Sequence, residues 1–292
     1  MSLKRREFLK IAGFAGASLL GARRAGANER EREFSAMLID TTLCEGCRSC
    51  EEACNEKNRL PRPDVPFDEE SVFEEIRDTL PGAYTVVNRY PNPKDPKNPI
   101  FVRRQCMHCN QPACASACLV RGLEKTRLGP VIYNKERCMG CRYCMISCPF
   151  DVPKFEYDSP LPYIKKCSFC FDRQMAGKIP ACADACPTGA TLFGSRRELL
   201  EVARERIYKN PGRYVHHIYG EHEVGGTGWL YLSAVPFDLI GFRTDLGTKP
   251  YPELTAGFLY GVPLVFVLWP SMLLALNYFT RKNGEGSNGE NE

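Results

Sequence analysis

The sequence predicts an α+β fold of two nested units with loop insertions, followed by one C-terminal transmembrane helix. Three observations predict it. Sixteen cysteines stand in four groups, short strand-like segments flank these groups, and residues 254–280 contain no charged side chain. The expected order is a signal at residues 1–27, a cysteine-rich domain at 28–249, a transmembrane anchor at 250–280 and a flexible cytoplasmic tail at 281–292.

The first 27 residues have the composition of an export signal. A basic head precedes a short apolar stretch, and Ala25-Gly26-Ala27 offers small residues at which a peptidase could cut. The apolar stretch is shorter than the roughly 20 residues that a bilayer span needs. The run Arg5-Arg6-Glu7-Phe8-Leu9-Lys10 resembles the twin-arginine signal and matches it at every specified position. We therefore expect export of a folded domain.

The charge balance excludes a nucleic-acid partner. The whole chain carries +4, but residues 1–27 hold six Lys/Arg and one Glu, a net +5, so the remainder carries −1. A nearly neutral domain lacks the concentrated basic surface that nucleic-acid binding requires. The hydrophobic fraction of 43% is ordinary for a globular protein, whereas 16 cysteines in 292 residues are not.

The cysteines form four regular groups, and none is left over. In order they are Cys44, Cys47, Cys50 and Cys54; Cys106, Cys109, Cys114 and Cys118; Cys138, Cys141, Cys144 and Cys148; Cys167, Cys170, Cys182 and Cys186. Groups one and three have the spacing C-x2-C-x2-C-x3-C, which is the bacterial ferredoxin spacing for [4Fe–4S] clusters. In that pattern three thiolates hold one cube and the fourth reaches the neighbouring cube.

Groups two and four are variants of the same pattern. Each opens with C-x2-C and closes with C-x3-C, but the middle gap widens to four residues in group two and to eleven in group four. Loops tolerate insertions of this kind. We therefore interpret all sixteen cysteines as iron ligands. In groups one and three, which have the ferredoxin spacing, we expect the fourth cysteine to begin or lie in a short helix.

The separation of the groups suggests how they pair. Groups two and three are only about twenty residues apart and can make one two-cluster ferredoxin-like unit, so groups one and four make the other and enclose it. The predicted sets for the four [4Fe–4S] clusters are Cys106, Cys109, Cys114 with Cys148; Cys138, Cys141, Cys144 with Cys118; Cys44, Cys47, Cys50 with Cys186; and Cys167, Cys170, Cys182 with Cys54. This nesting is a hypothesis.

Other uses of the cysteines fit the spacing less well. Eight disulfides would suit an oxidising compartment, but C-x2-C pairs are cramped for them and the chain is no small stapled scaffold. A c-type haem needs C-x-x-C-H, and no pair here is followed by His. Zinc uses two C-x2-C pairs and leaves the third cysteine of each group unexplained. A zinc-binding structural or assembly protein is the alternative of a different class.

Ordinary secondary structure is expected around the cysteine groups. Strand-like pieces occur at residues 84–90, 101–104, 131–133, 190–193 and 229–235. Residues 61–99 contain eight prolines, which block helix and internal strand and so predict a loop in 91–99. A soluble helix is expected over 195–210, with Ser195 and Glu198 forming a capping box.

The apolar segment near the C-terminus predicts a membrane anchor. Residues 254–280 exceed the length needed to cross about 30 Å of hydrocarbon. Arg281-Lys282 follow at once and should stay cytoplasmic, which places the cysteine-rich domain on the periplasmic face of the inner membrane. Pro263 and Pro270 would kink the span, and a packed partner helix would satisfy the freed carbonyls.

The four cysteine groups, the twin-arginine start, the segment 219–235 and the C-terminal anchor together resemble the four-cluster ferredoxin-like electron-transfer subunits of complex iron–sulfur enzymes. The resemblance covers most of the chain. Within that family the chain is most similar to the periplasmic iron–sulfur subunit of membrane-bound [NiFe] hydrogenases of the hydrogenase 2 type. One departure is that Asn55 and Leu119 stand where Pro often follows the last cysteine of a group, which removes no ligand.

The resemblance implies a non-catalytic chain that relays electrons through four [4Fe–4S] clusters. It would connect a periplasmic catalytic oxidoreductase, such as the small and large subunits of a [NiFe] hydrogenase, with an integral membrane subunit that reacts with quinone. The alternative within the family is the same relay in a formate dehydrogenase, a molybdopterin reductase or a quinone reductase complex. The sequence contains no nucleophile–base set, phosphate loop or open metal site, so we expect no catalytic residue.

Overall fold

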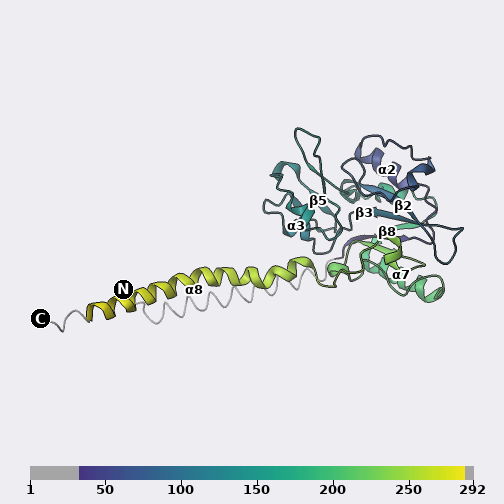
Figure 1. Ribbon diagram of the computed structural model, residues 1–292. Helices are drawn as coiled ribbons and strands as arrows, with labels where there is room; N and C mark the ends of the chain where they lie inside the picture. The colour runs from purple at the N-terminus through teal and green to yellow at the C-terminus, as the bar shows by residue number, and fades with distance from the viewer. Residues whose placement is uncertain (1–32, 287–292) are drawn as a thin grey trace.

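The computed structural model describes residues 33–286. A globular part is followed by one long helix, α8 (Tyr251–Gly286), which projects away from it (Figure 1). The predicted signal at residues 1–27 and the end of the predicted tail, 287–292, lie outside the described residues.

A three-stranded sheet of order β8-β1-β9 forms the centre of the globular part. Strand β1 (Ser35–Asp40) pairs antiparallel with β8 (Thr191–Ser195) and parallel with β9 (Trp229–Leu232). Because successive side chains of a strand point to opposite faces, β1 contributes to two cores. Ala36 and Leu38 pack with helix α7, whereas Met37 and Ile39 face the core that contains Trp229 and several cysteines.

Helix α7 (Arg196–Lys209) covers one face of this sheet. The backbone N–H of Glu198 donates to Oγ of Ser195 at 3.3 Å, which confirms the predicted N-cap. Leu199, Leu200 and Ala203 are buried against the strands.

The remaining strands form three antiparallel pairs next to the cysteine loops. They are β2 (Thr85–Tyr90) with β3 (Ile100–Gln105), β4 (Leu123–Lys125) with β5 (Val131–Tyr133), and β6 (Lys154–Phe155) with β7 (Ile164–Lys165). The proline-rich loop 91–99 connects β2 to β3, as predicted. The mixture of short strands and helices confirms the α+β class.

Four of the five short helices within residues 33–286 carry cysteines, and the helix predicted at the fourth cysteine is found in group one but not in group three. The five are α2 (Ser49–Asn58), α3 (Ala113–Ser116), α4 (Tyr143–Ile146), α5 (Phe171–Met175) and α6 (Ala181–Asp184), with 3₁₀ turns at Glu70–Phe73, Lys135–Arg137, Glu223–Gly225 and Phe237–Ile240. Only Cys54 is a fourth cysteine inside a helix. In groups two to four the helix carries the third cysteine, and it ends before the fourth because it spans a single turn.

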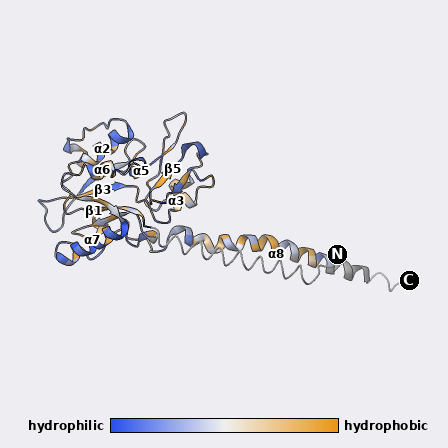
Figure 2. Cartoon of the chain, turned by 180° about the vertical axis from the view of Figure 1, so that it is seen from behind, coloured by the Kyte–Doolittle hydropathy of each residue, from blue (hydrophilic) through white to orange (hydrophobic). Residues whose placement is uncertain are grey.

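The C-terminal helix has the properties of a membrane span. Tyr251–Tyr278 is long and apolar enough to cross a bilayer, and this stretch is not buried against the rest of the chain (Figure 2). Pro263 and Pro270 both lie inside this one helix, which continues to Gly286.

Candidate metal centres

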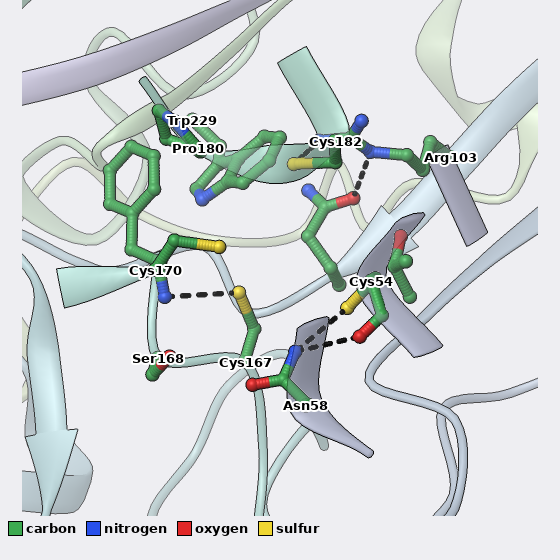
Figure 3. Close-up of a pocket in the computed structure, with 12 residues that line it drawn as sticks. Cys54, Asn58, Arg103, Cys167, Ser168, Cys170, Pro180, Cys182 and Trp229 are labelled. Atoms are coloured by element: carbon green, nitrogen blue, oxygen red, sulfur yellow. Dashed lines mark hydrogen bonds between the residues drawn. The ribbon is translucent and has the colours of Figure 1, made fainter. Parts of the chain in front are cut away.

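Four thiols from two distant groups face one cavity. Cys54 of the first group and Cys167, Cys170 and Cys182 of the fourth line one cavity. Their sulfur atoms point toward a common space (Figure 3). Two features place them there: helix α2 presents Cys54, and α6 presents Cys182.

The other twelve cysteines gather in three further sets. Cys44 interacts electrostatically with Cys47 and Cys186, and Cys50 with Cys44. Cys109 interacts with Cys106, Cys114 and Cys148, while Cys144 interacts with Cys118, Cys138 and Cys141. Each set therefore combines three cysteines of one group with the fourth cysteine of another.

Contacts between the sets give them a linear order. Cys50 interacts with Cys182, Cys167 with Cys106, and Cys114 with Cys144. The cysteine groups therefore follow one another in space as one, four, two, three. Both ends of this row reach the surface, since Cys47 and Cys141 are exposed.

The thiol sets fit a body larger than one ion. Within residues 33–286 no three His, Cys, Asp or Glu side chains come together closely enough to hold a single metal ion. A tetrahedral zinc site needs such a group. Four thiols around an enclosed cavity, with N–H donors directed at sulfur, instead suit a [4Fe–4S] cube. The donors include the N–H of Gly122 to Cys118 (3.0 Å) and the N–H of Phe169 to Cys167 (3.2 Å).

The C-x2-C loops share one backbone conformation. The residue directly before the second cysteine has a positive φ in every group: Gly46 (75°), His108 (47°), Gly140 (74°) and Phe169 (58°). Glycine adopts this left-handed region at little cost, but an aromatic residue does not. Groups one and three thus share glycine at this position, and groups two and four share an aromatic ring.

Burial keeps the metal-free thiols protonated. It raises the pKa of Cys50, Cys54 and Cys114 to about 12, and neighbouring thiolates act in the same direction. Cys186 differs: burial would raise its pKa, but hydrogen bonds from Thr188 and Thr191 hold it below the ordinary value. Because iron binds the thiolate, most ligands must release a proton when the site fills.

Three cations stand among the thiols, of which Arg103 and Lys166 are buried and Lys125 is half-buried. Arg103 donates from Nη2 to Sγ of Cys182 at 3.5 Å; burial alone would lower its pKa, but the thiolates of Cys182 and Cys50 raise it. Lys125 donates to the carbonyls of His108 and Cys109, and burial lowers its pKa to about 8. These charges oppose the negative charge of a thiolate-ligated cluster.

The third cation is Lys166, which is 7% exposed and donates to the carbonyls of Val131 and Cys167. Arg103 and Lys166 are among the basic residues that lie close to ligands in sequence. Lys125 was not predicted, and neither were Trp229 and His108, which lie in the core beside the cysteine loops. Only the position of His108 inside a C-x2-C loop could have pointed to it.

Comparisons with known proteins agree with this chemistry. A family model described as a 4Fe-4S dicluster domain matches residues 98–196, which contain groups two to four. The Hydrogenase-2 operon protein HybA of Escherichia coli O157:H7 is 33% identical over 96% of this chain and 96% of its own. This chain belongs to the same iron–sulfur family.

Other proteins are also similar to this chain in sequence. A protein of Nitratidesulfovibrio vulgaris is 46% identical over 96% of this chain and 78% of its own. The iron–sulfur subunit of the nitrate-inducible formate dehydrogenase of Escherichia coli is 36% identical over 68% of this chain and 67% of its own. The family therefore includes proteins of hydrogenase and of formate dehydrogenase systems.

Proposed function

We propose that this chain is a non-catalytic electron-transfer subunit that holds four [4Fe–4S] clusters in a row. The observation that carries the proposal is the cavity shared by Cys54, Cys167, Cys170 and Cys182, because it joins a cysteine of the first group to three of the fourth. The ligand sets are those of the nested arrangement: Cys54, Cys167, Cys170, Cys182; Cys44, Cys47, Cys50, Cys186; Cys106, Cys109, Cys114, Cys148; and Cys118, Cys138, Cys141, Cys144.

Each cluster, when bound, takes up and releases one electron, with no bond made or broken in the protein. The residues of the chain hold and insulate it. Sixteen thiolates provide the ligands, and the apolar core around Phe169 and Trp229 excludes water from the inner sets. Arg103, Lys125 and Lys166 offset the charge of the sets. Proton release accompanies ligand binding rather than electron transfer.

The row has two ends at which electrons can enter and leave. One is the set with exposed Cys47, and the other is the set with exposed Cys141. The two inner sets are more enclosed. Five of their eight cysteines are buried, namely Cys54, Cys170, Cys182, Cys106 and Cys114. Desolvation, followed by the neighbouring thiols, raises the pKa of Cys167 and Cys109 well above the ordinary value. This arrangement favours relay from end to end over reaction with solutes at the centre.

We assign the chain to a periplasmic complex at the inner membrane. The similarity to HybA over nearly the whole chain supports a [NiFe] hydrogenase as catalytic partner. Helix α8 supports a membrane anchor next to an integral quinone-reactive subunit. The twin-arginine pattern and Arg281-Lys282 support a periplasmic domain. Similarity to a formate dehydrogenase subunit favours that enzyme as the second candidate, although it covers less of the chain.

Metal analysis and co-purification test the proposal. Protein purified anaerobically from membranes is expected to contain about sixteen iron and sixteen sulfide per chain, with a brown absorbance band. About four zinc and no iron would overturn it in favour of a zinc-binding protein. The enzyme that co-purifies through a tag on this chain decides the partner: a hydrogenase large subunit supports the first assignment, and a formate dehydrogenase catalytic subunit replaces it.

A further inference from the structure

Four side chains form a column through the core, from the cavity lined by Cys54 to the second cysteine group. They are Arg103, Trp229, Phe169 and His108. Cζ of Arg103 lies 4.5 Å from the ring centre of Trp229, which lies 5.3 Å from that of Phe169. The ring centre of Phe169 lies 5.0 Å from that of His108. All four side chains are at most 3% exposed. They come from β3, β9 and the C-x2-C loops of groups four and two.

Three members of the column carry N–H groups that have no hydrogen-bond partner among residues 33–286. They are Nη1 of Arg103, Nε1 of Trp229 and Nε2 of His108. The N–H of Val131 donates to Nδ1 of His108 at 2.9 Å, so the proton of the neutral ring is on Nε2. A buried donor that is left without an acceptor destabilises the folded protein. Three such donors in one column therefore indicate acceptors that do not belong to the polypeptide.

The surroundings of the donors indicate where these acceptors lie. Arg103 and Trp229 line the cavity of Cys54, Cys167, Cys170 and Cys182, and Trp229 lies at its wall beside Cys170 and Cys182 (Figure 3). His108 stands between Cys106 and Cys109 in its own loop. Trp229 and His108 thus lie beside the two inner thiol sets, and Arg103 lies between the Cys54 set and the neighbouring Cys50.

The backbone conformation of two column residues, His108 and Phe169, indicates that the arrangement of the column is functionally important. His108 and Phe169 have φ of 47° and 58°, where groups one and three have glycine. Non-glycine residues persist in this region only when the surrounding structure compensates, and they cluster at functional sites. Here the strained pair forms the ring contact that joins the two inner loops.

We propose that this column sets the reduction potentials of the two inner clusters. Arg103 and Trp229 supply hydrogen bonds to the cluster held by the Cys54 set, and His108 supplies one to the cluster held by the Cys106 set. The inference rests on the proposed function, because it requires clusters in these sets. Hydrogen bonds and positive charge stabilise the more negative, reduced state and therefore raise the potential. The four residues adjust the reduction potentials of the inner clusters and do not carry electrons themselves.

Two substitutions test the proposal while preserving the rings. Trp229→Phe and His108→Phe each remove one N–H, and the chain itself has Phe169 at the position equivalent to His108. The matched control is Tyr219→Phe, which removes an aromatic donor that is bonded to the carbonyl of Arg243, outside the column. Each protein is purified in its complex, assayed for iron and titrated with EPR detection.

The expected result is a shift of one redox step in each of the two variants. At fixed potential the ratio of reduced to oxidised cluster should fall about tenfold for one lost hydrogen bond, which is about 59 mV for a one-electron couple. Trp229→Phe and His108→Phe should shift different steps, the other three steps should stay, and Tyr219→Phe should shift none.

Failure of this proposal can be distinguished from failure of the proposed function. Unchanged redox steps in both variants, with wild-type iron content, would overturn the column's role and leave the proposed function standing. Wild-type protein without iron would overturn the proposed function itself. Loss of iron in either variant would show that the residue is needed for holding the cluster; Trp229→His and His108→Gln, which restore an N–H donor, must then recover the iron or the proposal fails.

Discussion

Arg77 and Glu51 form an ion pair at 2.7 Å that ties the segment before β2 to helix α2, which carries Cys50 and Cys54. The carboxylate of Glu51 is 5% exposed and also accepts from Arg48 (3.3 Å) and from the N–H of Val87. One buried carboxylate thereby holds two cysteines of two different sets against the β2–β3 hairpin.

Replacing this carboxylate should destabilise the protein. Glu51→Gln leaves Arg48, which is 2% exposed, without its counter-charge, and breaking a buried pair in this way costs about 3–5 kcal/mol. We expect a lower thermal unfolding midpoint and reduced iron content. Glu52→Gln, an exposed change in the same helix, is the control and should leave both unchanged. Equal midpoints for the two variants would contradict the role given to Glu51.

Two glycines at equivalent positions should differ in their tolerance of a methyl group. Gly46 and Gly140 both have positive φ, so alanine costs about 1–2 kcal/mol at either position. A Cβ on Gly46 would also overlap the ring of Phe101, whereas none of the surrounding atoms lies within 4 Å of one on Gly140. Gly46→Ala should therefore lower the unfolding midpoint more than Gly140→Ala. The reverse order would show that the Phe101 contact is unimportant.

The nested ligand sets predict which cluster a single cysteine serves. Cys186→Ser should release the cluster of the first group, because Cys186 interacts with Cys44. Iron should fall from about sixteen to about twelve per chain, and Cys44, Cys47 and Cys50 should become open to alkylation, as mapped by mass spectrometry. Cys54→Ser is the reciprocal variant and should expose cysteines of the fourth group. Alkylation confined to the fourth group in Cys186→Ser would refute the nesting.

Cluster assembly should depend on pH with a definite sign. Burial raises the pKa of several thiols to about 12, so the metal-free protein holds protons that iron must displace. Raising the pH lowers the cost of that displacement. Anaerobic reconstitution with iron and sulfide should therefore be more complete at pH 9 than at pH 7, as followed by the brown absorbance band. A yield that does not change with pH would argue against buried, protonated ligands.

The N-terminal arginines predict the route of export. We propose that Arg5→Lys with Arg6→Lys leaves cluster-loaded protein in the cytoplasm, because that route carries folded domains and the thiols must acquire clusters where they stay reduced. Cell fractionation with iron analysis measures the outcome. Normal export and normal activity of the double variant would exclude this route.

The local parts of the fold could be predicted from the sequence because local chemistry determines them. Spacing alone identified the cysteine loops, Ser195 and Glu198 marked the start of α7, and the prolines of 91–99 marked the β2–β3 connection. The helix position was wrong for group three, where a single turn is too short to reach the fourth cysteine.

What the sequence could not predict depends on contacts between distant residues. Arg103 and Trp229 belong to strands β3 and β9, and their contact exists only after the sheet and hairpin have packed. The left-handed backbone of His108 and Phe169 opposes their intrinsic preference, so tertiary packing overrides the local signal. Nothing in the spacing of cysteines carries this information.

The central sheet also constrains the order of events during synthesis. Strand β1 leaves the ribosome before any cysteine group, yet its partners β8 and β9 follow the last one. Such non-local pairing forms late because a long loop must close first. All sixteen cysteines therefore lie in a chain segment that stays open until its far end has been made. The β8–β1 ladder, which holds the two ends of this segment together, can close only after every cysteine group has been synthesised.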